Sequence, residues 1–126
     1  MDLIRRPSNK ELFNKIKQGR KSVSQGDILP VDLDVIAEDA AKLGYQAKNL
    51  QSVLSQLLAE VKIEHYIGAY PPRKSYEPII KDCELFEFIW TSKRLGCDVY
   101  LKYCLMGGIF YLVSLHEDRP KVLQKK

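Results

Sequence analysis

The fold of this chain is decided by the stretch Asp98-Val-Tyr-Leu-Lys-Tyr-Cys-Leu-Met-Gly-Gly-Ile-Phe-Tyr-Leu-Val-Ser-Leu-His-Glu117. Two runs of residues that favour β-strands meet at Gly107-Gly108, and glycines readily adopt the positive φ angles of a tight hairpin turn. The stretch therefore predicts a β-hairpin whose turn consists of these two glycines.

The turn also predicts which residues face each other across the hairpin. One side should carry the pairs Tyr100 with Leu115, Lys102 with Val113, and Cys104 with Tyr111. The other side should carry an almost wholly apolar set, namely Val99, Leu101, Tyr103, Leu105, Phe110, Leu112, Ser114 and His116. We expect the apolar side to pack on helices. This leaves Tyr100 and Lys102 on the open side, where they can hold a polyanion.

The composition is that of one basic domain. The chain has 126 residues, a formal net charge of +4 and three cysteines. Such a length suits a single domain, and the charge favours an acidic partner such as RNA. The cysteines lack the spacing of a disulfide framework or a zinc site, so we expect no metal and no other cofactor. Apolar runs long enough for a membrane span or a signal peptide are missing, which predicts a soluble, cytoplasmic protein.

The first helix should begin at the capping box Ser8-Asn9-Lys10-Glu11 and end near Gly19. A polar connection should follow from Arg20 to Asp27, with room for a short strand at 22–24. The alternative for Arg20 and Lys21 in this connection is a contact with nucleic acid.

Two more helices are predicted before residue 62. Pro30 and Asp32 introduce the second helix, and Gly44 is the natural residue to end it. The third helix begins at about Asn49 and carries a clean apolar stripe, which consists of Leu50, Val53, Leu54, Leu57, Leu58 and Val61. We expect this stripe to cover the apolar side of the hairpin.

The C-terminal half should form a sheet. Leu85 to Trp90 alternate as a half-buried strand, with Glu87 on the less aromatic side. With a turn at 91–96 and the hairpin, this strand makes an antiparallel meander of three or more strands. The sequence thus predicts an α+β fold in which N-terminal helices pack on that meander. One domain should span 1–126, with a helical half at about 8–61, the meander at about 62–117 and a basic, mobile tail at 118–126.

A loop before the first strand of the meander has the composition of an RNA-binding segment. Pro71-Pro72 makes 70–78 a loop or a sheet edge. Within it, Arg73 and Lys74 lie beside Tyr76, and single-stranded RNA selects cations for its phosphates and rings for its bases. Arg94 in the next turn is a further cation that we expect to bind RNA. The alternative is a basic surface loop whose tyrosines pack inward.

Four stretches of the chain follow one another in an order that is also found in a known protein family. They are Leu43-Gly44 before the third helix, the strand 85–90, Gly96 followed by Val99-Tyr100-Leu101-Lys102, and Val113-Ser114-Leu115-His116. Together they resemble the MqsR family of toxin–antitoxin mRNA interferases, from about Leu43 to about Glu117. The resemblance implies a RelE-like fold and cleavage of single-stranded mRNA without a metal, on or off the ribosome. It also implies a cognate antitoxin protein that silences the toxin.

The resemblance assigns site residues to matching positions. The tyrosine of the family's Val-Tyr-Leu-Lys motif matches Tyr100, and a polar residue on the preceding strand, usually glutamine, matches Glu87. A lysine in the family's loop has no clean match because the segment 68–82 is longer here; Arg73 or Lys74 can serve instead. The family's lysine near the end of the last strand is replaced by His116. The chain therefore departs from the family at two presumed site positions.

Elementary chemistry gives these residues possible roles. Metal-free RNA cleavage needs a base for the 2′-hydroxyl proton, an acid for the 5′-oxygen and cations for the charge on the phosphorane. The cations can be Lys102, Arg73 and Lys74, Tyr100 can stack or donate a proton, and the base can be Glu87 or His116.

His116 has the ordinary pKa best suited to this chemistry. The predicted register, however, places His116 on the other side of the hairpin from Tyr100 and Lys102. Only a bulge or a twisted strand end would place His116 on the side of Tyr100 and Lys102. The alternative is that His116 is an ordinary histidine at the edge of the sheet, without a role in catalysis. His65, beside Tyr66, is a further candidate base.

The sequence therefore predicts an endoribonuclease toxin of a type II toxin–antitoxin system, which arrests growth by cutting mRNA. Two alternatives remain open. One is a non-catalytic RNA- or DNA-binding module on the same fold, since the same cations and rings bind a strand without cutting it. The other is a protein-interaction domain that uses the aromatic segment 66–76 and a sheet edge.

Overall fold

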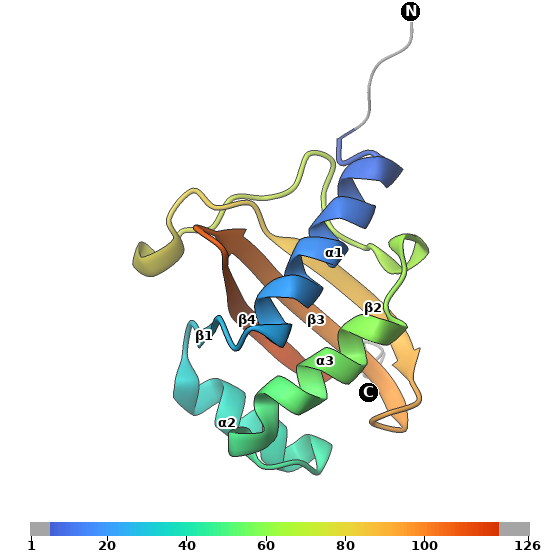
Figure 1. The fold of residues 1–126 in the computed structure, drawn as a ribbon, viewed down its shortest axis with the longest axis vertical. Helices are drawn as coiled ribbons and strands as arrows, with labels where there is room; N and C mark the ends of the chain where they lie inside the picture. The colour runs from blue at the N-terminus through green and yellow to red at the C-terminus, as the bar shows by residue number, and fades with distance from the viewer. Residues whose placement is uncertain (1–5, 119–126) are drawn as a thin grey trace, which may run out of the picture.

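Three helices of the N-terminal half pack against one face of a four-stranded mixed sheet (Figure 1). The computed structural model describes residues 6–118, so most of the predicted tail lies outside the described residues. The strand order is β1-β4-β3-β2. β2 (Phe86–Ser92), β3 (Cys97–Met106) and β4 (Ile109–Glu117) form the antiparallel meander, and β1 (Ile28–Pro30) runs parallel to β4. The predicted α+β fold is confirmed.

α1 (Asn9–Ser24) is longer than predicted. It begins as expected, with the Ser8 side chain accepting a hydrogen bond from the Glu11 backbone N–H at 3.0 Å. It does not end at Gly19, so the predicted polar connection and short strand at 22–24 are wrong. Gly19 instead lets the helix approach the sheet, because a Cβ there would lie 3.3 Å from Phe110 Cε2. The helix ends just before Gly26, whose φ is +79°.

The two other helices agree with the predictions. α2 (Leu33–Leu43) begins at Asp32, whose carboxylate accepts a hydrogen bond from the Val35 N–H, and ends at Gly44 with a φ of +89°. α3 (Leu50–Glu60) and the residue that follows it, Val61, bury the whole predicted apolar stripe. In Figure 1, α1 and α3 cross the front face of the sheet and α2 lies below them. The core cluster unites α1, α2 and α3 with one face of β2, β3 and β4.

The hairpin turns at Gly107 and Gly108, both with positive φ, as predicted. Near the turn the predicted register is correct, and Cys104 pairs with Tyr111. Between Lys102 and Tyr103, however, the register shifts by one residue. From there on, the predicted pairing is wrong: Lys102 faces Ser114, Tyr100 faces His116 and Leu101 faces Leu115.

The shift is a β-bulge that reassigns the sides of β4. Tyr103 pairs with Leu112 and Lys102 with Ser114, which makes Val113 the extra residue on β4. Past the bulge, Leu115 is fully buried among the core residues. The predicted side was therefore wrong for Leu115, for Ser114 and for His116. A turn dictates register only as far as the ladder stays regular.

The segment between α3 and β2 is pinned to the rest of the fold. The strand-like residues 73–75 pair with 83–85, through Ser75 N–H to Cys83 O at 2.9 Å and Leu85 N–H to Arg73 O at 2.8 Å. The short 3-10 helix η3 (Pro78–Ile80) then places Ile80 over Cys104, on the face of the sheet opposite the helices.

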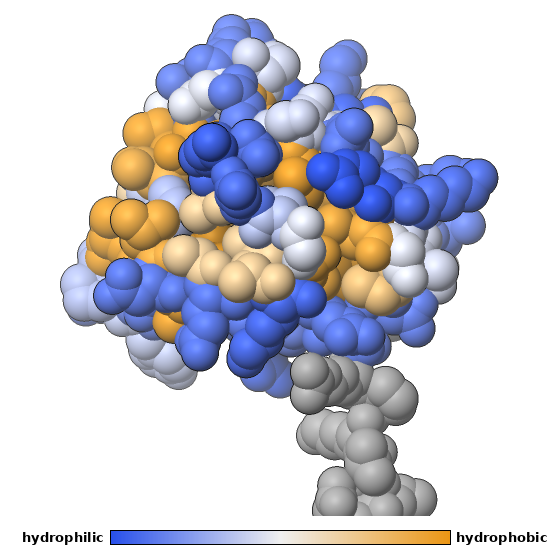
Figure 2. Space-filling view, turned by 90° about the horizontal axis from the view of Figure 1, so that it is seen from below, coloured by the Kyte–Doolittle hydropathy of each residue, from blue (hydrophilic) through white to orange (hydrophobic). Residues whose placement is uncertain are grey.

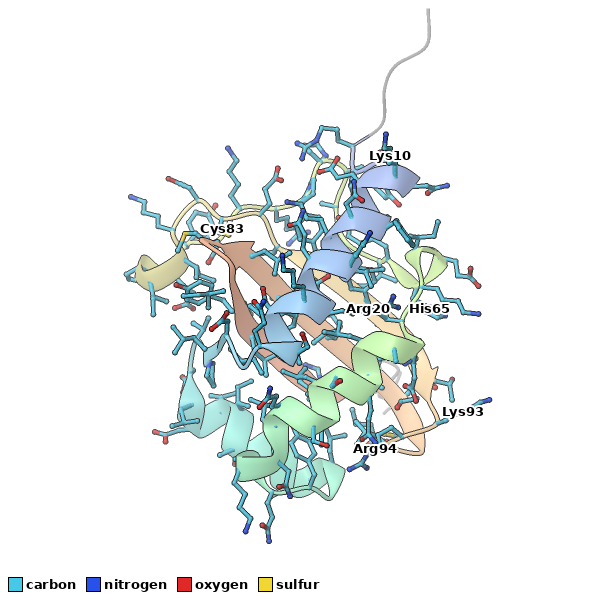
Figure 3. All side chains as sticks on the ribbon, viewed as in Figure 1. Lys10, Arg20, His65, Cys83, Lys93 and Arg94 are labelled. Atoms are coloured by element: carbon cyan, nitrogen blue, oxygen red, sulfur yellow. The ribbon has the colours of Figure 1, made fainter. Side chains whose placement is uncertain are left out.

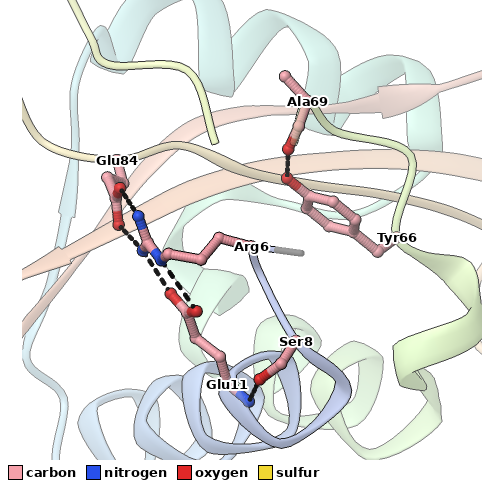
Figure 4. A network of polar contacts seen from close by, with 6 residues as sticks. All are labelled: Arg6, Ser8, Glu11, Tyr66, Ala69 and Glu84. Atoms are coloured by element: carbon pink, nitrogen blue, oxygen red, sulfur yellow. Dashed lines mark hydrogen bonds and ion pairs between the residues drawn. The ribbon is translucent and has the colours of Figure 1, made fainter. Parts of the chain in front are cut away.

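The N-terminal end of α1 is tied to the same segment (Figure 4). The guanidinium of Arg6 lies 2.6 Å from a Glu11 carboxylate oxygen and 3.0 Å from one of Glu84. The hydrogen bond from Arg6 lowers the pKa of Glu11. In the same view the Tyr66 hydroxyl donates a hydrogen bond of 2.6 Å to the Ala69 carbonyl. None of the helices within residues 6–118 has the length and apolar character needed to cross a membrane.

Candidate functional site

Polar side chains from three adjacent strands gather on the face of the sheet that α1 and α3 leave uncovered. Glu87 on β2 pairs with Lys102 on β3, and Lys102 pairs with Ser114 on β4. One step along, Tyr100 pairs with His116. We call Glu87, Tyr100, Lys102, Ser114 and His116 the open-face cluster. All five are half-buried, so their polar groups remain accessible.

Tyr100 and His116 are stacked, with ring centroids 5.0 Å apart and an interplanar angle of 27°. The bulge at Val113 is responsible, because it turns His116 onto the side of Tyr100. The Nδ1 atom of His116 lies 2.9 Å from the backbone oxygen of Glu117. Since a carbonyl oxygen only accepts hydrogen bonds, Nδ1 carries the hydrogen. The neutral ring therefore offers the lone pair of Nε2, the arrangement of a general base.

Tyr100 also binds the acidic member of the cluster. Its hydroxyl donates a hydrogen bond of 2.6 Å to Glu87 Oε1. Burial, followed by the hydrogen bond and charge of Glu87, raises the pKa of Tyr100 far above its ordinary value, while Arg73 opposes the shift. Tyr100 is thus a protonated donor at neutral pH. The Nζ atom of Lys102 lies 6.0 Å from the centroid of the same ring.

A groove of about 250 Å³ joins the cluster to the loop before β2. Its lining residues are Arg73, Lys74, Ser75, Tyr76, Glu77, Leu85, Glu87, Lys102 and Val113. Arg73 and Lys74, both exposed, bring two cations to the groove, and Tyr76 is 95 % exposed at its edge. The structure therefore brings Arg73, Lys74 and Tyr76 together with Glu87 and Lys102 in one groove, and RNA binding by this loop stays a prediction.

A second groove, of about 320 Å³, lies at the other end of the cluster. His116 lines it together with Glu117 and Asp118, and α2 contributes Asp39 and Lys42. Sequence reasoning missed Asp39 and Lys42 as neighbours of His116. No local signal could have found them, because α2 meets the end of β4 only through the tertiary fold. This end of the face is acidic, whereas the loop end is basic.

Three residues considered at the sequence level lie apart from the cluster. Figure 3 shows Arg94 at the turn between β2 and β3, next to α3. Its backbone N–H donates to Glu60 at 2.8 Å, and its guanidinium hydrogen-bonds Gln56. His65 stacks on Trp90 with centroids 6.1 Å apart, and its Nδ1 accepts a hydrogen bond from the Lys62 N–H.

Arg20 is the third of these residues. Its Nε donates to the Leu58 carbonyl at 2.6 Å, so Arg20 binds the C-terminal end of α3 (Figure 3). Arg94, His65 and Arg20 are therefore engaged in contacts on the helical side. The sequence grouped them by composition, which cannot tell the two sides of a sheet apart.

Apolar side chains gather on another surface, at the left of Figure 2, where β1 and the start of α2 lie. The exposed members of this region are Leu29, Leu33 and Val35. The outer edge of β1 is poorly suited to accept a further strand. The Ile28 N–H already donates to Gly26 O at 3.0 Å, and Pro30 has no N–H.

Within residues 6–118, no three His, Cys, Asp or Glu side chains are arranged to hold a metal ion. Comparison of the chain with protein-family models, with curated proteins and with solved structures finds no match. The resemblance to the MqsR family therefore stays a prediction. What the chain does must follow from the chemistry of its own residues.

Proposed function

We propose that this chain is the toxin of a type II toxin–antitoxin system, a metal-independent endoribonuclease that cuts single-stranded mRNA at the open-face cluster. The observation that carries the proposal is the stack of His116 on Tyr100 at 5.0 Å. It brings an imidazole with a free ring nitrogen together with a cation and a hydrogen-bonded phenol on one accessible face.

The cluster suggests a role for each side chain. Nε2 of His116 takes the proton of the RNA 2′-hydroxyl, and the 2′-oxygen attacks the adjacent phosphorus. Lys102 stabilises the charge of the phosphorane and gives a proton to the 5′-oxygen as it leaves. The products are a 2′,3′-cyclic phosphate and a 5′-hydroxyl. Tyr100, whose hydroxyl donates to Glu87 at 2.6 Å, orients the imidazole by stacking.

This assignment chooses between the two bases that the sequence left open. Glu87 already accepts the hydroxyl of Tyr100, which leaves its carboxylate partly engaged. Among residues 6–118, the ring of His116 makes a hydrogen bond only through Nδ1, which leaves Nε2 for the substrate. We therefore assign the base to His116 and treat Glu87 as the residue that positions Tyr100.

The groove at the loop end supports the choice of substrate. Arg73 and Lys74 line it with Lys102 and supply positive charge for consecutive phosphates. Tyr76, 95 % exposed, offers a ring on which an unpaired base can stack. The partners in this proposal are mRNA and an antitoxin protein that blocks the open face.

The test is cleavage of a single-stranded RNA of mixed sequence by the purified chain in the presence of a chelator. Wild type should produce new 5′-hydroxyl ends, and induced expression should arrest growth. His116→Ala and Lys102→Ala should each lower turnover by about 100-fold or more, the usual contribution of a proton-transfer group. Lys10→Ala removes an equal charge from the start of α1 and should leave turnover unchanged (Figure 3).

Two results would redirect the proposal. Intact RNA with wild type, together with RNA binding that weakens steeply as salt rises, would identify a non-catalytic nucleic-acid-binding module. If the folded protein neither cuts RNA nor binds it in a salt-dependent way, the remaining reading is a protein-interaction domain. Lys102→Ala separates a nucleic-acid-binding module from an enzyme. In an enzyme this variant loses turnover more than affinity for RNA, whereas in a binding module it loses affinity alone.

A further inference from the structure

Two of the three cysteines meet under η3, on the face that carries the open-face cluster. Cys104 is a buried residue of β3, and Cys83 is a half-buried residue shortly before β2. Figure 3 shows Cys83 at the end of the sheet near η3. Continuing the pairing of β2 with β3 toward Cys83 places Leu85 across from Cys104, and Cys83 on the same side one step beyond.

The two thiols are neighbours in a small apolar cluster. Cys83 packs against the cluster formed by Cys104, Ile80 and Tyr111, and its Sγ donates to the Leu105 carbonyl at 3.5 Å. Burial raises the pKa of the Cys104 thiol, and the hydrogen bond with the Cys83 thiol raises it further. Cys104 therefore remains a neutral thiol, and the more accessible Cys83 is the sulfur that a reagent in solution meets first.

We propose that Cys83 and Cys104 form a site of reversible oxidation, at which a peroxide converts the two neighbouring thiols into an intramolecular disulfide. The Cys83 sulfur first attacks the peroxide and takes one oxygen, which gives a sulfenic acid and releases one water from hydrogen peroxide. The Cys104 sulfur then attacks the Cys83 sulfur, and the S–S bond forms as the S–O bond of the sulfenic acid breaks. The Cys104 thiol proton joins the departing hydroxide, which leaves as the second water. Two thiols lose two hydrogen atoms, and one peroxide is reduced to two waters.

The disulfide would fix the loop that borders the groove. The backbone of Cys83 accepts from the Ser75 N–H at 2.9 Å and donates to the Ile80 carbonyl at 3.0 Å. A covalent bond from Cys83 to the floor of the sheet therefore ties the segment 73–83 to β3. This inference does not depend on RNA cleavage, since it concerns only the two thiols and the segment they join.

The test treats the full chain carrying Cys97→Ser with hydrogen peroxide and then alkylates the remaining thiols under denaturing conditions. We expect a monomer that takes up no alkyl group, that is lighter than the reduced chain by two hydrogen atoms, and that yields a peptide linking residues 83 and 104. Dithiothreitol should restore two alkylatable thiols. The matched control carries both Cys83→Ser and Cys97→Ser. After the same treatment, Cys104 in this control should keep its thiol.

A second measurement follows the consequence for the loop. Amide hydrogen exchange at 73–83 should be slower in the oxidised chain than in the reduced chain, and unchanged by peroxide in the control. If Cys97→Ser does not fold, the disulfide is mapped in the oxidised wild-type chain instead, where the peptide linking residues 83 and 104 is again expected. The proposal is overturned by a sulfinic acid at Cys83 with a free Cys104 thiol, or by disulfides that join two molecules.

Discussion

Tyr100 and His116 stack at 5.0 Å on the open face, although a hairpin paired regularly from its glycine turn would place them on opposite sides of the sheet. The single extra residue of the bulge, Val113, makes the difference. Because side chains alternate along a strand, one additional residue reverses the side of every residue beyond it. The bulge therefore buries Leu115 and brings His116 to Tyr100.

Tyr100→Phe separates the contribution of the hydroxyl from that of the ring. It removes the hydrogen bond to Glu87 and keeps the stack on His116, so the free energy of unfolding should fall by about 1 kcal/mol. Tyr100→Ala also removes the ring and should cost about 2–3 kcal/mol. Urea denaturation measures both, and Tyr76→Phe, at a residue that is 95 % exposed, is the neutral control. Equal losses for the two Tyr100 variants would show that the stack contributes nothing.

Stability should fall in alkaline solution because buried tyrosines resist ionisation. Burial, and the charge of Asp39, raise the pKa of Tyr45 to about 12, and burial is also the main cause that raises the pKa of Tyr66 to about 12. In the unfolded chain both tyrosines titrate at about pH 10. Above that pH the folded state holds more protons than the unfolded state, so the free energy of unfolding decreases as the pH rises. Below pH 10 this stabilisation is complete. Urea denaturation at about pH 8 and about pH 11 measures the loss.

Tyr45→Phe should stabilise the protein. Within residues 6–118, the buried hydroxyl of Tyr45 has no hydrogen-bond partner, and a buried unpaired hydroxyl costs about 1–3 kcal/mol. Its removal should raise the free energy of unfolding by about 1 kcal/mol and reduce the alkaline loss. Tyr66→Phe is the contrast, since the Tyr66 hydroxyl donates to Ala69 and its loss should destabilise. A destabilised Tyr45→Phe would mean that the hydroxyl is satisfied in solution.

Glu60 should make the protein sensitive to acid. Burial opposes ionisation of Glu60, but hydrogen bonds from four groups together lower the pKa of Glu60. They come from the Trp90 ring N–H at 2.9 Å, the Arg94 backbone N–H at 2.8 Å, the Ser92 side chain and the Lys93 backbone. The stabilisation is present above the unfolded pKa, about 4.3, and is lost as the pH falls through the folded pKa. Acid titration of the unfolding free energy measures it.

The matched variants are Glu60→Gln and Glu64→Gln. Glu60→Gln should cost about 1 kcal/mol at neutral pH, limited by the partial exposure of this side chain, and should flatten the acid dependence. Glu64 is exposed, and its replacement should change neither quantity. If the unfolding free energy of Glu60→Gln still falls in acid, the acid sensitivity comes from other carboxylates, such as Glu11 beside Arg6.

Gly19→Val should destabilise the contact between α1 and the sheet. A Cβ at Gly19 would lie 3.3 Å from Phe110 Cε2, so the branched side chain must displace a core ring, which costs about 1–3 kcal/mol. Gln18→Val introduces the same side chain at an exposed neighbour in the same helix. Thermal unfolding of the two variants isolates the packing cost, and equal melting temperatures would contradict close packing at Gly19.

Much of the fold follows from residues that are near one another in the chain. Asp32 and Gly44 mark the two ends of α2 through local effects. Asp32 accepts a hydrogen bond from a backbone N–H of the first turn, and Gly44 adopts the positive φ with which the helix ends. The apolar stripe of α3 and the glycine turn of the hairpin are equally local. For the candidate site, the sequence was sufficient to name Tyr100 and Lys102 as neighbours on one strand face, since alternation along a strand is a local property.

Other features depend on contacts between distant segments. α1 continues past Gly19 because Phe110 lies against that glycine, and the three-residue β1 exists because β4 lies beside it. The bulge that brings His116 to Tyr100 is decided by which residues of β4 the helices can bury, and no neighbour in sequence carries that information. Local periodicity and capping thus suffice to specify the helices and the hairpin, whereas packing across the chain decides which side chains share the open face.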